Sequence, residues 1–148
     1  MNKIFLIIFI IFNFANAKDL IFYHDIKEAL NSKFAKQYLN NDVEFEFYNN
    51  KTSDDEQLKI SKATSRYRKI YDTFKKEHVL LDKDYKISCQ YAFIAVLKAF
   101  GEKAKTENKV KVINLQGNFK NQLHNSKDKF QCAVGKFVTT VSLQGNLK

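Results

Sequence analysis

The 148-residue chain contains no proline, no tryptophan, four glycines and two cysteines. Four glycines leave no room for a glycine-rich phosphate loop, and no Walker motif is present. No cysteines stand at the C-x-x-C spacing, and no histidines at the H-x-x-x-H spacing, that would indicate a zinc site. These absences exclude the nucleotide-binding and metal-binding classes that short motifs can identify.

The beginning of the chain is typical of a secretory signal peptide. An early lysine precedes an apolar run at residues 4–12, and the small-x-small triplet 15–17 stands just before Lys18. The run is too short for a membrane anchor, which needs about 20 apolar residues. Because Lys18 is not a cysteine, no lipid attachment site follows the predicted cut. The sequence therefore predicts a signal peptide at residues 1–17 and a soluble periplasmic or secreted protein, a single domain at residues 18–148.

The chain is basic, with 25 Lys and Arg against 16 Asp and Glu and a formal charge of +9. In an exported protein this balance favours weak contact with polyanions, such as nucleic acid outside the cell, acidic glycolipid or an acidic partner. The lysines are scattered along the sequence, however, which is also what solubility alone would require.

An even number of cysteines in an exported chain predicts a disulfide, here between Cys89 and Cys132. The alternative is a metal site, for which His24, His78 and His124 would be the only nitrogen ligands. None of the three has the spacing of a metal motif. We therefore expect a disulfide, no metal and no cofactor.

Residues 84–105 form the one long and strongly periodic helix candidate. Apolar residues recur at the i, i+3, i+4, i+7 spacing and make a single stripe. The stripe consists of Tyr85, Cys89, Ala92, Phe93, Val96, Phe100 and Ala104. We expect this stripe to pack on strands near the C-terminus that carry Cys132.

Tyr91 and Ile94 lie on the side of this helix opposite Cys89 and Val96. Exposed apolar residues are common and would need no explanation. The alternative is that the pair contacts another subunit or a protein partner, where a central aromatic often contributes much of the binding energy. The sequence thus nominates Tyr91 and Ile94 as partner-binding residues.

The remaining segments predict a small α+β domain. Asp25 and Glu28 have the spacing of a capping box, which predicts that a helix begins there. The segment 58–74 could be helix or strand: its lack of Gly and Pro allows a helix, whereas its Thr and Tyr residues favour a strand. We expect a strand at 19–24, a helix at 26–39, a strand at 43–48, a connection at 75–82, a strand at 110–115, a polar turn at 121–127 and an extended run at 128–147.

Several local features refine the C-terminal half. Asn108 suits a left-handed helix end, and Gly135 suggests a bulge or kink within the extended run. A near-repeat, Leu-Gln-Gly-Asn, occupies 115–118 and 143–146 and is interpreted as coincidence, because Gly-Asn favours turns. The predicted fold class is α+β, an antiparallel sheet with one long helix packed on it, ending in a C-terminal β-hairpin. We expect the strand at 110–115 and the extended run 128–147 to form this hairpin across the polar turn.

No catalytic set is recognisable in the sequence. A nucleophile needs a base and an orienting group, but each of the three histidines stands in a cap, a linker or a polar turn. The acidic pair Asp54-Asp55 reads as solvated charge in a loop. We expect no enzyme activity.

The chain resembles a group of small exported proteobacterial proteins that are often mislabelled as an excinuclease ATPase subunit. The segments that carry the resemblance are 88–93, 104–105, 110–114, 130–135 and 141–145, together with 29–32 and the pair Phe45 and Phe47. More distantly, the helix and hairpin are similar to the YbjQ family and to RcsF, the outer-membrane stress sensor. The resemblance departs at the loop before Val110, which lacks the usual glycine, and at Lys111.

The resemblance implies a YbjQ/RcsF-like α+β fold, a Cys89–Cys132 bridge similar to one in RcsF, and ring assembly as in YbjQ relatives. It implies no enzyme. The expected function is a soluble, periplasmic, non-enzymatic binding domain with an envelope-stress role, acting on an unknown protein partner. The alternative is an oligomeric secreted binder of polyanions or of a small ligand.

Overall fold

The computed structural model describes residues 19–48, 56–66, 69–72, 76–80 and 85–148. The predicted signal peptide and the acidic pair Asp54-Asp55 lie outside the described residues. The helices are α1 (Ile26–Leu30), α2 (Lys33–Tyr38) and α3 (Tyr85–Thr106). The strands are β1 (Leu20–Asp25), β2 (Glu44–Phe47), β3 (Leu58–Ser65), β4 (Lys69–Asp72), β5 (Glu77–Leu80), β6 (Lys111–Phe119), β7 (Gln122–His124), β8 (Lys129–Val134) and β9 (Val138–Leu147).

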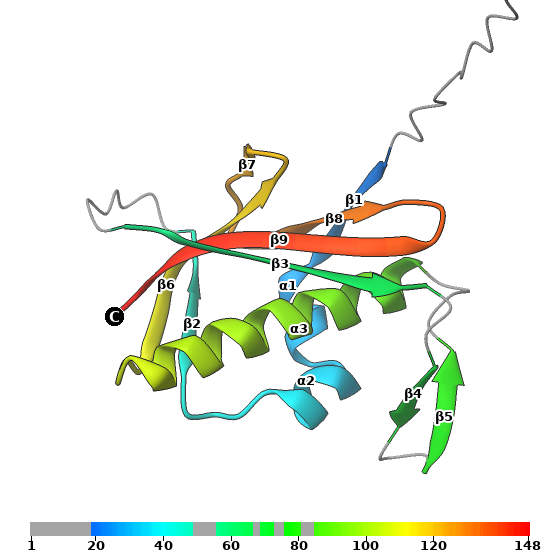
Figure 1. Cartoon of the computed structure of the whole chain (residues 1–148), viewed down its shortest axis with the longest axis horizontal. Coiled ribbons are helices and arrows are strands. Elements are labelled where there is room, and N and C mark those ends of the chain that lie inside the picture. Colours follow the sequence, from blue (N-terminus) through cyan, green and yellow to red (C-terminus); the bar gives the residue numbers. More distant parts are fainter. Residues whose placement is uncertain (1–18, 49–55, 67–68, 73–75, 81–84) are drawn as a thin grey trace, which may run out of the picture.

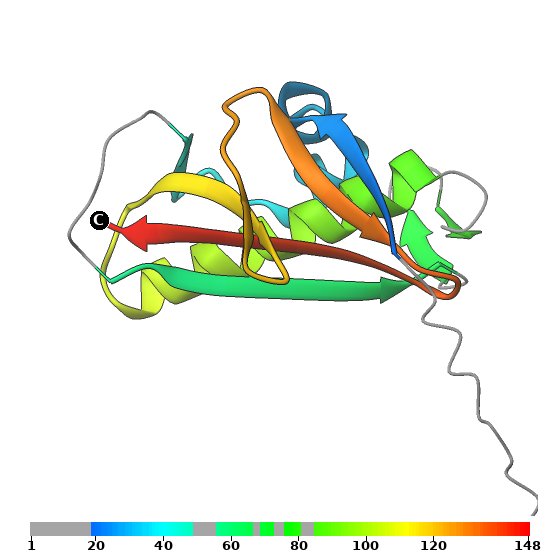
Figure 2. The same ribbon diagram turned by 90° about the horizontal axis from the view of Figure 1, so that it is seen from above.

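A seven-stranded sheet and the long helix α3 make up the α+β fold that the sequence predicts. The strand order is β1-β8-β9-β6-β2, with β3 paired to the other side of β9 and β7 paired to β6. Helices α1, α2 and α3 lie on one face of this sheet, and β7 rises on the opposite face (Figures 1 and 2). The sheet is mostly antiparallel, but β2 runs parallel to β6. Strands β4 and β5 form a separate two-stranded sheet.

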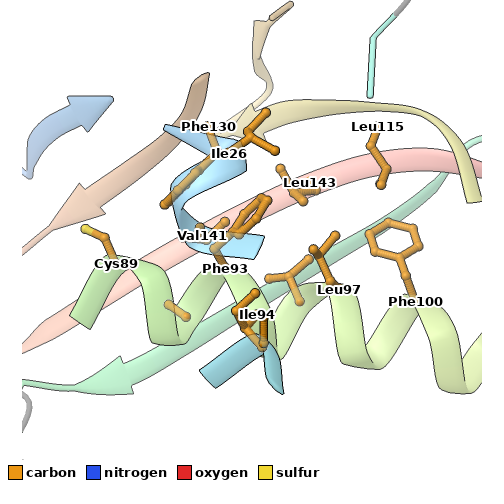
Figure 3. Close-up of a cluster of buried hydrophobic side chains, with 14 of the residues drawn as sticks. Ile26, Cys89, Phe93, Ile94, Leu97, Phe100, Leu115, Phe130, Val141 and Leu143 are labelled. Atoms are coloured by element: carbon orange, nitrogen blue, oxygen red, sulfur yellow. The ribbon is translucent and has the colours of Figure 1, made fainter. Parts of the chain in front are cut away.

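The core lies between α3 and the inward face of the sheet. As predicted, the helical stripe buries Cys89, Phe93 and Phe100, although Tyr85 is exposed at its edge. The rings of Phe93 and Phe130 are stacked with their centroids 4.1 Å apart. Figure 3 shows these rings among side chains from α3, β6, β8 and β9. Burying each large apolar side chain contributes roughly 1.5–3 kcal/mol, so this contact holds the helix on the sheet.

The prediction of a single helix at 26–39 is wrong, because the chain forms two short helices there, α1 and α2. Asp25 caps α1 as predicted, with the Glu28 N–H donating to its carboxylate at 2.8 Å. Ser32 then caps α2, accepting a hydrogen bond from the Ala35 N–H at 3.3 Å. A serine that accepts a hydrogen bond from the backbone N–H three residues later caps the start of a helix. The chain therefore turns at Asn31, and a new helix begins after Ser32.

The strand preference for 58–74 is confirmed in its described parts, which are β3 and β4. Two segments predicted to be connections contain short strands instead: β5 lies within 75–82 and β7 within 121–127. Each is a strand of three or four residues that pairs with a neighbour along the chain. Such short segments carry too few side chains for an alternating pattern to be read.

The extended run 128–147 folds back on itself and forms two strands, β8 and β9. At Gly135 the backbone turns, and its N–H donates to the Val138 carbonyl at 2.8 Å. The chain therefore ends in a hairpin, but not in the predicted one, because both of its strands come from this run. Strand β6, which we expected to pair across the polar turn, pairs antiparallel with β9 and also forms its own hairpin with β7.

Two asparagines adopt the left-handed backbone conformation at important positions. Asn108 has φ 54° at the end of α3, as predicted. Asn114 has φ 58° within β6, where the pairing with both β9 and β2 shifts register. Asparagine tolerates this conformation better than most residues, so Asn114 is the residue at which β6 bulges.

Candidate binding cleft beside helix α3

The predicted disulfide is present and joins α3 to β8. Cys89 and Cys132 are bonded with their Cα atoms 5.9 Å apart. Both cysteines are fully buried. The bond lies at the N-terminal half of α3, next to the stacked pair of Phe93 and Phe130, and it fixes that end of the helix to the sheet.

The expectation that Ile94 is exposed and available to a partner is wrong. Ile94 is only 1% exposed and belongs to the main hydrophobic cluster. Figure 3 shows it on α3 between Phe93 and Leu97. The reason is that α1 and α2 cover this side of the helix, so α3 is buried on two sides within its own domain. A partner could reach Ile94 only if the domain opened.

Tyr91 is half-buried and lies against α2. Its ring makes edge-on contacts with Phe34, at a centroid distance of 5.4 Å, and with Tyr38, at 5.9 Å. Such pairs contribute about 0.5–1.5 kcal/mol beyond the area that they bury. The structure therefore separates the two nominated residues: Ile94 belongs to the core, and Tyr91 lines a cleft.

The cleft runs along the part of α3 that neither the sheet nor α2 covers. It has a volume of about 390 Å³ and lies between α2 on one side and β3 on the other. Its lining residues are Tyr38, Lys62, Tyr91, Ala95, Lys98, Ala99 and Glu102. Ala95 and Ala99 form a floor of short side chains, and the two tyrosines form one wall.

A second hollow of about 270 Å³ adjoins the cleft and shares Tyr38, Lys98 and Glu102 with it. Its floor is apolar, made by side chains that include Phe45 and Leu97. Polar and charged side chains, which include Gln37, Asn40 and Glu102, surround this floor, so the lining of the hollow is mixed. The two hollows together form the candidate site.

The charges around the candidate site are mainly basic. Lys98 lies 3.7 Å from Glu102, and Lys105 lies 2.6 Å from Asp42. These groups are solvent-exposed, so each pair contributes little to stability. Lys62 approaches from β3 and adds a further positive charge at the mouth of the cleft. The arrangement suits a ligand or partner with an apolar or aromatic group and an acidic group.

No histidine lines either hollow of the candidate site. His24 packs against Phe130 at a ring distance of 5.6 Å, and His124 packs against Tyr23 at 4.7 Å. His78 lies in β5. Within the described ranges, no group of three or more His, Cys, Asp or Glu side chains could hold a metal ion.

A polar network on the sheet face opposite α3 was missed by the sequence analysis. The two copies of the near-repeat lie on paired strands, with Gln116 opposite Gln144. Asn118 donates a hydrogen bond to the Gln144 side chain, which in turn donates to Gln57. The interpretation of the repeat as coincidence is therefore incomplete, because its amides bond across three segments of chain. The signal was in the sequence, but only the strand pairing shows that the two copies meet.

Comparison of the chain with family models, with curated proteins and with solved structures found no match. In the part of the chain that the structure describes, no helix has the length and apolar character needed to cross a membrane.

Proposed function

We propose that this protein is an exported, non-enzymatic binding domain and that it holds its ligand or partner in the cleft beside α3. The observation that carries the proposal is the cleft itself, which places two tyrosine rings and Lys62 around the short side chains of Ala95 and Ala99. Lys98 and Lys105 also line the two hollows, each beside an acidic side chain. Tyrosine rings, short apolar side chains and flexible lysines hold a ligand by stacking, apolar contact and charge. The cleft also contains Tyr91, one of the two residues that the sequence nominated for partner binding.

The buried disulfide supports export. Disulfides persist in oxidising compartments and are rare in the cytosol. Cys89 and Cys132 form such a bond inside the core, and the first residues of the chain have the pattern of a secretory signal. An envelope-stress role, and a relationship to the YbjQ and RcsF proteins, follow from the resemblance alone and form the finer part of the proposal.

The alternative, a polyanion binder, has less support. Seven lysines of the described residues lie within 4 Å of an acidic side chain: Lys86, Lys98, Lys103, Lys105, Lys111, Lys120 and Lys129. These pairs are spread over α3 and several strands. A polyanion site instead concentrates unneutralised lysines on one face.

The test is crosslinking in intact cells from two matched positions on α3. Lys98 and Lys103 have side chains exposed to 49% and 48%, and each lies near a glutamate four residues later. Lys98 lines the cleft and Lys103 does not. A photoreactive residue replacing Lys98 should attach to a specific partner or ligand, while the same residue at Lys103 should not.

Two results would contradict the proposal. Equal products from Lys98 and Lys103 would show that the cleft has no special role, and absence of any product from Lys98 would show that the cleft is empty in the cell. Fractionation of the same cells gives an independent check, because the oxidised protein should be found outside the cytoplasm.

A further inference from the structure

Four strands of the described sheet, β1, β2, β3 and β7, lie at an edge, and they differ in their protection against further pairing. Edge strands expose unpaired backbone groups, which natural proteins guard with charged residues, with short length or with irregularity. Strand β3 carries Lys59 and Lys62. Strand β2 is only four residues long and carries Glu44 and Glu46. Strand β7 has only three residues. These three edges are therefore protected.

Strand β1 is less protected. It is six residues long and contains no lysine, glycine or proline, and its one acidic residue, Asp25, stands at its end. Its pairing with β8 is continuous from Leu20 to Asp25 without a bulge, and among the described residues no strand pairs with its other edge. Figure 2 shows β1 at the margin of the sheet, beside β8. An unprotected and regular edge of this kind is a template for strand addition.

Three large apolar side chains of β1 are exposed. Leu20 is 57% exposed, Ile21 is 38% exposed and Tyr23 is 53% exposed. Ile21 and Tyr23 pair with Ala133 and Gln131 on the face of the sheet away from α3. Large apolar side chains beside unpaired backbone are costly to leave in water and are best covered by another strand.

We propose that β1 pairs antiparallel with β1 of a second copy of this chain, with Phe22 of each copy opposite Phe22 of the other. This register keeps side chains of the same face together, as a continuous sheet requires. It places Ile21 opposite Tyr23 and Leu20 opposite His24. An aromatic residue opposite a β-branched residue is a favourable cross-strand pair.

The charges at the ends of β1 permit this pairing. The proposed register places Asp19 opposite Asp25, which would repel if both were unpaired. Each has a lysine of its own copy nearby: Lys120 lies 2.8 Å from Asp19, and Lys129 lies 3.8 Å from Asp25. The twofold arrangement also covers two unprotected edges at once, whereas an unrelated strand would cover only one. This is the reason for choosing a second copy over a peptide from another protein.

The interface is small, so the pairing should be reversible and dependent on concentration. Two six-residue strands bury far less surface than the roughly 1,200–2,000 Å² of a stable complex. Sedimentation equilibrium of the oxidised protein, purified from cells that express the full chain, should show the mean mass rising towards twice the single-chain mass as concentration rises.

A matched pair of variants tests the site. Tyr23→Lys introduces onto β1 a lysine like those of β3, and it should keep the mass at one chain at every concentration. Leu123→Lys changes an equally exposed apolar residue, 56% exposed on β7, and should leave the rise in mass unchanged. Thermal melts establish that both variants are folded.

The register has its own test, because the natural cysteines are bonded and buried. Ile21→Cys and Tyr23→Cys would be directly opposite one another across the proposed pair, within the Cα separation that a disulfide needs. An oxidised mixture of the two variants should give a crosslinked dimer, while each variant alone should give several-fold less. A single-chain mass for the unchanged protein at all concentrations, an equal effect of Leu123→Lys, or equal crosslinking by the separate variants would each overturn the proposal.

Discussion

Loss of the Cys89–Cys132 bond should remove a large part of the stability of this domain. The two cysteines are 43 residues apart in sequence, so the bond closes a loop of about 44 residues in the unfolded chain. The chain-entropy relation gives about −13 cal/mol/K for such a loop, which is about 4 kcal/mol at 25 °C. Since single domains have total unfolding free energies of only about 5–15 kcal/mol, the reduced protein should be marginally stable.

Urea unfolding at 25 °C, followed by far-ultraviolet circular dichroism, measures this loss. The oxidised protein, the reduced protein and the Cys89→Ala/Cys132→Ala variant form the comparison. The reduced protein retains both sulfur atoms, so its loss reports the crosslink alone. The double variant also loses the buried sulfurs and should be less stable again. With a urea dependence of about 1–3 kcal/mol/M, the unfolding midpoint of the reduced protein should fall by roughly 1.3–4 M.

Two observations would refute this reasoning. One is an unchanged urea midpoint after reduction, with both thiols verified as free. The other is the detection of two free thiols in the denatured but unreduced protein, because the bond would then be absent from the start.

Three further predictions concern single residues and use the same unfolding assay. Ile94→Ala should lower the unfolding free energy by about 2–5 kcal/mol because it leaves a cavity in the core, whereas the exposed Lys98→Ala should cost less than about 0.5 kcal/mol; equal effects would contradict the buried placement of Ile94. Asn114→Gly should be nearly neutral and Asn114→Val should cost at least about 1 kcal/mol, because Val cannot adopt the left-handed conformation without strain; a tolerated Val would show that the bulge is not required. The hydrogen bond and charge of Glu44 raise the pKa of Lys111 above its ordinary 10.5. The contribution of this pair to the unfolding free energy should therefore be complete below pH 10.5 and be lost as pH rises through the raised pKa of Lys111. The Lys111→Met variant should not show this loss of stability at alkaline pH.

The main helix could be predicted from sequence because its apolar stripe repeats over 22 residues. The apolar periodicity did not lead us to predict that Ile94 is buried, although part of the pattern was present in the sequence. Tyr91, Ile94 and Leu97 also recur at helical spacing and form a second stripe on another side of α3. A second stripe predicts burial only if something lies over it. What covers it here is the α1–α2 pair, whose position depends on the turn at Asn31, on the Ser32 cap and on tertiary packing.

Strand pairing was less predictable than strand formation. The alternation in 43–48 predicts the strand that is now β2, but no local signal shows that it runs parallel to β6. The hydrogen bond between Asn118 and Gln144 likewise depends on β6 and β9 being neighbours. The local pattern of apolar residues indicates whether a segment is a helix or a strand. The neighbour of a strand and its parallel or antiparallel direction depend instead on contacts between residues far apart in sequence.

The lengths of the helices explain why the candidate cleft exists. At 1.5 Å per residue, α3 with its 22 residues is about 33 Å long, whereas α2 with its six residues is about 9 Å long. A helix as short as α2 covers Ile94 and meets Tyr91 but cannot extend along the rest of α3. The side of the helix beyond Tyr38 is therefore left open, and the short side chains of Ala95 and Ala99 leave it hollow. The division of residues 26–39 into two short helices, which the sequence analysis did not predict, is thus the structural cause of the cleft in which we place the function.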